Sequence, residues 1–223
     1  MKKHIWYISP SSQVMNLGAG DYGTEMEQMR LLAEAIVPHL DRAGVSFHLA
    51  DEELSLGMRV EESNSMDTCF HLALHSNAGG RGKARGPVAY YYSEAGRAFG
   101  EKVVRELLDL GQESNRASNL NEDKKLYETR ATRAPACLLE VDFHDNPAGA
   151  EFIMTRRQDI AQAIAKAIIH HDGKEFVSLT DGECVDESVR LGLFDPGTRW
   201  DEPITAEDAA KLAVRLIGYL QRR

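Results

Sequence analysis

The sequence predicts an α/β fold: a mostly parallel central sheet with helices on both faces, plus a small C-terminal helical appendage. Two observations predict it. In the first 172 residues, short apolar runs of strand type alternate with longer segments of helical periodicity, an order typical of parallel sheets. After residue 172 the long apolar runs stop. We therefore expect a main domain at residues 1–172 and a small module at residues 173–223.

Strands are expected where apolar residues follow one another and end at turn-forming residues. Such runs occupy residues 5–8, 45–49, 69–74, 87–92 and 136–141. In a sheet of this type the functional groups gather beyond the carboxyl ends of the strands. The loop after residue 8, His75 and Glu140 all fall at such ends. These are therefore the candidate functional positions.

Helices are expected where apolar residues recur at steps of three and four. The first helix opens at Thr24 and has Glu25 and Glu27 in its first turn, where the helix dipole favours acidic side chains. It is expected to end near residues 43–44. Further helices are expected at residues 95–110, 160–169 and, in the C-terminal module, 203–219, with a weaker helical pattern at residues 53–64.

Composition limits the classes of function. The 223 residues carry a formal net charge of −9, which argues against a dedicated nucleic-acid binder. No apolar stretch approaches the ~20 residues that a membrane-spanning helix needs, so no membrane partner is expected. Three cysteines without a CxxC pair exclude a sulfur-rich zinc site. The apolar run near the N-terminus is too short for an export signal, so we expect a protein that is cytoplasmic as synthesised.

Glu25, His75 and Glu140 are residue types that a hydrolytic zinc site uses. Zinc binds imidazole nitrogen and carboxylate oxygen and keeps one position open for water, while a carboxylate that is not a ligand moves protons. From the residues alone, other interpretations stay open: Glu25 could serve only the helix dipole, and His75 could be a turn residue. Glu140 is more informative, because an ionised carboxylate in a buried apolar run is costly unless it is paired. His71 shares a strand face with His75 but lies about 13 Å away, so we do not expect it to be a co-ligand.

Four segments, in order, resemble the zinc-dependent N-acetylmuramoyl-L-alanine amidases of the Amidase_3 type. They are YGTEMEQMRLLAEAIVPHL, HLALHSNAGG, PACLLEVDFHDNPAGAEFI and IAQAIAKAII, and the resemblance extends over roughly residues 5–170. The opening segment ISPSSQVMNLGAGDYGTE is similar to a clostridial and phage-lysin branch of this family. The resemblance implies an α/β hydrolase that acts on peptidoglycan.

The resemblance also implies roles for particular residues. Glu25 and His75 match two zinc ligands, and Glu140 matches the catalytic glutamate. Most members place a third ligand, a histidine, in a D-P-G-H-G segment after the first strand, but here residues 9–13 read Ser-Pro-Ser-Ser-Gln. Gln13 is the nearest residue with a ligating oxygen, and Ser12 is the alternative. An amide oxygen is a weaker zinc donor than imidazole, so we expect one weakly bound zinc ion.

The function implied is hydrolysis of the amide between N-acetylmuramic acid and L-alanine by a zinc-activated water. The alternative is a non-catalytic cell-wall-binding homologue with a degenerate metal site. In either case the partner is peptidoglycan, which the protein would reach after release from the cell, as an autolysin or endolysin does. The C-terminal segment GLFDPGTRWDEPITAEDAAKLAVRL resembles part of an S-layer-homology motif, present in one incomplete copy.

Overall fold

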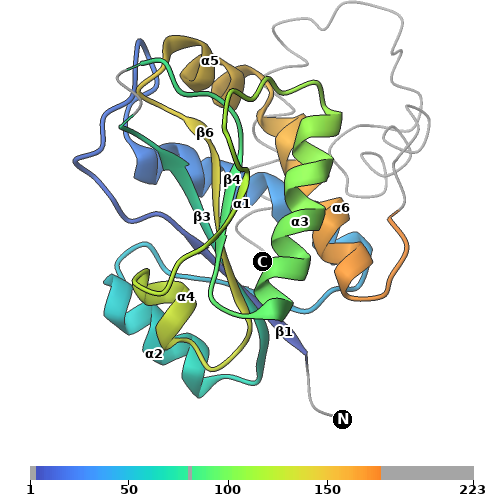
Figure 1. Cartoon of the computed structure of the whole chain (residues 1–223). Helices are drawn as coiled ribbons and strands as arrows, with labels where there is room; N and C mark the ends of the chain where they lie inside the picture. The colour runs from blue at the N-terminus through green and yellow to red at the C-terminus, as the bar shows by residue number, and fades with distance from the viewer. Residues whose placement is uncertain (1–3, 80–81, 177–223) are drawn as a thin grey trace, which may run out of the picture. The chain divides into compact units, whose positions relative to one another are not determined.

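The structure is a computed structural model, and it describes residues 4–79 and 82–176 (Figure 1). The chain divides into two units, Met1–Phe176 and Val177–Arg223. The described residues all belong to the first unit. The expected helix at residues 203–219, and all of the C-terminal module beyond residue 176, lie outside the described residues.

Six strands form one sheet in the order β2-β1-β3-β6-β4-β5. The four parallel strands are β2 (Phe47–Leu49), β1 (Ile5–Pro10), β3 (Thr68–Asn77) and β6 (Ala136–Phe143). At the far edge, β4 (Val88–Tyr91) pairs antiparallel with β6, and β5 (Leu120–Glu122) runs parallel to β4. The predicted mostly parallel sheet is therefore confirmed, and the reversed pair lies at one edge.

Helices cover both faces of the sheet, as predicted. On one face α1 (Glu25–Arg42) and α3 (Glu94–Asp109) both pack against α6 (Arg157–His171). On the other face α2 (Leu56–Ser65) and α4 (Tyr127–Ala131) contact each other, and they pack on β3 and β6 respectively. Figure 1 shows α3 and α6 to the right of the sheet and the pair α2 and α4 at its lower left. The remaining helix, α5 (Pro147–Thr155), follows β6 directly.

The two faces of β1 and β3 differ in chemistry, because successive side chains of a strand point to opposite sides of the sheet. The face that packs against α1, α3 and α6 is apolar and carries Trp6, Ile8, Phe70, Leu72 and Leu74. The alternate positions, which include Ser9, His71 and His75, meet polar side chains of the first turn of α1 and of α2 and α4. Apolar packing and the candidate chemistry thus occupy opposite faces of the same strands.

Several boundaries differ from those expected. The apolar run at residues 69–74 continues as strand to Asn77, so His75 lies inside β3 and not in a turn after it. The three short elements β5, α4 and α5 were not expected from the sequence. Of these, α4 matters most, because it contributes a buried side chain to the candidate site.

None of the helices in the described ranges is long and apolar enough to cross a membrane.

Candidate active site

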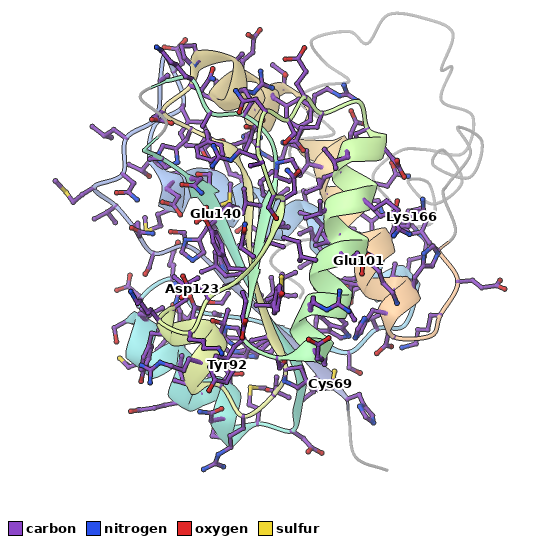
Figure 2. The ribbon with its side chains drawn as sticks, viewed as in Figure 1. Cys69, Tyr92, Glu101, Asp123, Glu140 and Lys166 are labelled. Carbon is purple, nitrogen blue, oxygen red and sulfur yellow. The ribbon has the colours of Figure 1, made fainter. Side chains whose placement is uncertain are left out.

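The candidate residues converge at the carboxyl ends of the parallel strands. Gln13 lies in the loop after β1, Glu25 is the first residue of α1, and His75 and Glu140 are register partners on β3 and β6. Figure 2 places Glu140 in the upper half of the sheet, on the side of these strand ends. The structure therefore brings together all four residues that the sequence singled out.

The start of α1 turns Glu25 inward. Thr24 caps the helix in a capping box with Glu27, whose carboxylate accepts the Thr24 backbone N–H at 2.9 Å. Thr24 and Glu27 thus supply the capping hydrogen bonds at this end of the helix. The Glu25 side chain is not needed for capping, is only 1% exposed and faces the site. Glu25 therefore does more than complement the helix dipole.

Glu25 and His75 are in direct contact. His75 Nδ1 lies 2.7 Å from Glu25 Oε1, and Asn16 Nδ2 donates to Glu25 Oε2 at 2.7 Å. Burial alone would raise the pKa of Glu25, but hydrogen bonds from His75, Asn16 and Ser11 outweigh it and hold the pKa below its usual value. Glu25 is therefore an ionised carboxylate inside the protein, stabilised by its neighbours.

Gln13 reaches the same pair from the loop after β1. Its Nε2 lies 3.4 Å from His75 Nδ1, and its Oε1 accepts a hydrogen bond from Asn16 Nδ2 at 2.9 Å. Asn16 therefore links Gln13 to Glu25. In this arrangement the amide nitrogen of Gln13 faces the histidine, so the amide would have to turn over to present its oxygen to a metal ion.

Glu128 of α4 is a site residue that the sequence did not indicate. It is 3% exposed, and its Oε2 lies 3.6 Å from His75 Nε2. Its Oε1 accepts hydrogen bonds from Ser9 Oγ at 2.6 Å and from His71 Nε2 at 3.1 Å. Burial would raise the pKa of Glu128, but His71 and His75 lower it far below its usual value. In the sequence it lies in the polar segment KLYETRATR and has no feature that separates it from surface acids.

His75 consequently lies between two carboxylates, one at each ring nitrogen. Its burial disfavours the imidazolium, but Glu128 and Glu25 raise its pKa to about 10. The ring is therefore held between two carboxylates that favour its charged form.

Glu140 differs from the other acids of the site. Its Oε2 is buried and has no hydrogen-bond partner among the described residues. Burial raises its pKa to about 7, with a lowering effect from His75 and a further raising effect from Glu25. A carboxyl group that titrates near neutral pH can both accept and return a proton, which is what a general acid-base catalyst must do.

The sequence profile of the N-acetylmuramoyl-L-alanine amidase family, Amidase_3, matches residues 16–170. This chain belongs to that family. The match includes Glu25, His75, Glu128 and Glu140 and begins after Gln13. A comparison with curated protein sequences finds no significant match.

Solved amidase structures share the fold. AmiC2, an N-acetylmuramoyl-L-alanine amidase of Nostoc punctiforme, is 20% identical with a TM-score of 0.68, over 77% of this chain and 98% of that chain. The catalytic domain of the amidase CwlV of Paenibacillus polymyxa is 19% identical with a TM-score of 0.70, over 77% and 99% of the two chains. The catalytic domain of the CD27L endolysin, which targets Clostridium difficile, is 18% identical with a TM-score of 0.62, over 76% and 98%. At these identities the likeness establishes the architecture.

Amidases of this family are generally zinc-dependent. Within the described ranges, no group of three or more His, Cys, Asp or Glu side chains is arranged to hold a metal ion. Two donors are in contact, one carboxylate oxygen (Glu25 Oε1) and one imidazole nitrogen (His75 Nδ1), 2.7 Å apart. The amide of Gln13 lies beside them but faces His75 with its nitrogen, at 3.4 Å. Zinc accepts these donor types, although an amide oxygen is the weakest of them. Glu25 and His75 thus supply two donors of the types that zinc prefers, and Gln13 could add only a weak one after its amide turns over.

Proposed function

We propose that this amidase hydrolyses the bond between N-acetylmuramic acid and the L-alanine of the stem peptide in peptidoglycan, with the help of a zinc ion. One observation carries the proposal. An unpartnered carboxylate, Glu140, with a pKa of about 7, is the cross-strand neighbour of the Glu25–His75 pair at the carboxyl end of the sheet. Metal-assisted amide hydrolysis uses such an arrangement: residues of the types that bind zinc, beside a group able to move protons.

In the proposed mechanism, Glu25, His75 and Gln13 would hold the zinc ion. When bound, zinc would polarise the scissile carbonyl and make a water more acidic. Asn16 keeps the carboxylate of Glu25 in place through its 2.7 Å hydrogen bond. Glu140 accepts the proton of the attacking water and returns it to the amine of L-alanine as that group leaves. Because its Oε2 has no competing partner in the described part of the chain, Glu140 is free to do so.

Digestion of purified peptidoglycan tests the proposal. The zinc-loaded protein should release new L-alanine amino termini, and zinc should restore this activity after treatment with a chelator. The Glu140→Gln variant, which keeps the size of the side chain but cannot accept the proton, should lose about 10²- to 10⁴-fold in rate. Glu151→Gln, a matched change on the exposed side of α5, should leave the rate unchanged.

The alternative function is wall binding without hydrolysis, and the replacement of a ligating histidine by Gln13 is the feature that favours it. A binding protein would sediment with insoluble peptidoglycan yet free no amino termini from any wall type, with or without zinc. That outcome would replace the enzyme proposal by the binding one.

We also propose that the protein is a lysin or autolysin of the clostridial and phage-lysin type, which meets the wall after release from the cell. The support is the resemblance of the segment ISPSSQVMNLGAGDYGTE to that branch. Two residues of this segment, Gln13 and Asn16, contact the Glu25–His75 pair. Lysis assays on clostridial and non-clostridial walls, with equal amounts of protein, test the proposal. Clostridial walls should be lysed faster.

A further inference from the structure

Glu128 is buried in a polar cluster on the face of the sheet that α2 and α4 cover. It comes from a helix of five residues, α4, which lies beside α2 at the lower left of Figure 1. A carboxylate that is 3% exposed is costly to bury unless hydrogen bonds and charges compensate it. The compensation here comes from three side chains on two neighbouring strands, Ser9, His71 and His75.

The two oxygens of Glu128 have different tasks. Oε1 is anchored, because it accepts hydrogen bonds from Ser9 on β1 and from His71 on β3. His71 is itself held: its Nδ1 lies 3.0 Å from Ser63 Oγ, and its ring stacks on Tyr7 with a centroid separation of 5.0 Å. The anchoring leaves Oε2 in a fixed position, 3.6 Å from His75 Nε2.

The two ring nitrogens of His75 therefore face different partners. Nδ1 points toward Glu25 and Gln13, where the proposed zinc site lies, and Nε2 points toward Glu128. A histidine that binds a metal through one nitrogen commonly donates the N–H of the other to a carboxylate, which fixes the ring and its tautomer. Glu128 cannot itself join Glu25 as a ligand in this arrangement, because the two carboxylates lie at opposite nitrogens of the same ring.

We propose that Glu128 is a positioning residue, which holds the Nε2–H of His75 so that Nδ1 is presented to the zinc site. The proposal rests on the proposed function in that it takes His75 to be a zinc ligand. It also assigns a role to Ser9, His71 and Ser63. Ser9 and His71 fix the carboxylate of Glu128, Ser63 fixes His71, and Glu128 in turn fixes the proposed zinc ligand His75.

The test compares Glu128→Gln with Glu62→Gln in the full-length protein. Glu62 is a suitable control, because it lies on α2 over the same face of the sheet. Its carboxylate accepts a hydrogen bond from Tyr7 at 2.5 Å and lies 3.2 Å from His48 Nε2. Zinc affinity is measured by competition with a chelator, and thermal unfolding checks that both variants are folded. Zinc binding should weaken about 10- to 100-fold in Glu128→Gln and stay unchanged in Glu62→Gln. Equal affinity in the wild type and Glu128→Gln would overturn the proposal.

Nitrogen-15 NMR of the histidine rings gives a second readout that needs no activity and no variant. In the wild-type protein, the Nε2–H of His75 should be present and slow to exchange with solvent, and zinc should shift Nδ1. If zinc instead shifts Nε2, the proposal is wrong, even if Glu128→Gln fails to fold. A wild type that shows the protected Nε2–H but frees no L-alanine termini would contradict the proposed function and leave the contact of Glu128 with His75 in place.

Discussion

Gln13 is the residue at which this chain departs from the ligand pattern of its family. Its amide nitrogen faces His75 at 3.4 Å, while its oxygen is held by Asn16 at 2.9 Å. The position is therefore close enough for a ligand, but the group offered is a weak donor that is engaged elsewhere. If the site binds zinc as proposed, its affinity should therefore increase when a stronger donor replaces this side chain.

Gln13→His should tighten zinc binding, because imidazole is a better donor for zinc than an amide oxygen. We expect a gain of at least about tenfold, equivalent to about 1.4 kcal/mol, measured by chelator competition. Val14→His is the matched control: it adds the same imidazole one residue further along, at a side chain that is 52% exposed. If the two variants bind zinc equally well, the third ligand is not at position 13.

At the level of elements, α3 approaches β6 so closely that only glycine fits at the contact. A Cβ on Gly96 would lie 2.2 Å from the backbone oxygen of Ala136, the first residue of β6. At Gly57, in the first turn of α2, an added Cβ would meet no atom within 4 Å. The two glycines therefore allow the same substitution to be made with and without a steric clash.

Gly96→Ala should destabilise the protein by about 1–3 kcal/mol, because α3 must move away from the sheet to admit the methyl group. Gly57→Ala should be neutral or stabilise by up to about 1 kcal/mol, since alanine loses less conformational entropy than glycine in a helix. Urea denaturation followed by circular dichroism measures both. A Gly96→Ala protein as stable as the wild type would mean that α3 does not pack on β6 at this distance.

The elements that could be predicted from the sequence are those whose own residues specify them. Thr24 and Glu27 form a capping box by themselves, and the apolar run that begins at residue 69 marks β3. By contrast, α4 has five residues and no side-chain cap, so it depends on tertiary contacts. Glu128 was missed for the same reason: its partners Ser9 and His71 are 119 and 57 residues away in the chain. His75 and Glu140 could be identified because each lies at the end of a predicted strand, and the family resemblance adds Glu25 to the same site.

At the scale of the whole unit, the apolar core and the candidate site lie on different sides of the sheet. One face and its helices α1, α3 and α6 form the apolar core, whereas the polar cluster around His75 lies toward the other face and the strand ends. One ionisable side chain nevertheless borders the apolar side. The ring of His171, at the end of α6, meets Trp6, Phe70 and Phe99 edge-on, with centroids 5.4 to 5.6 Å away. Its Nδ1 is buried without a hydrogen-bond partner among the described residues.

This placement predicts a loss of stability in mild acid. Burial lowers the pKa of His171, with a smaller lowering effect from Lys102 and an opposing one from Asp172. The unfolded chain therefore binds this proton more readily, so stability is full above the ordinary imidazole pKa and decreases as pH falls through it. His171→Phe should reduce the loss of unfolding free energy between pH 7 and pH 5. His170→Phe, at the exposed neighbour, should not, and equal slopes in both variants would contradict the prediction.

The unit Met1–Phe176 should fold and act without the rest of the chain, because its core is closed by its own helices. The boundary matters: Phe176 packs against this core and lies 6.0 Å from the ring of His39, so the shortened chain should end after Phe176 and not at residue 173. Such a chain should release L-alanine termini from short soluble muropeptides at the rate of the full-length protein. If residues 177–223 target the wall, as their partial S-layer-homology resemblance suggests, it should sediment less with whole walls. A shortened chain that is insoluble would show that residues 177–223 are needed for folding, and one that binds walls as well as the full-length protein would exclude the targeting role.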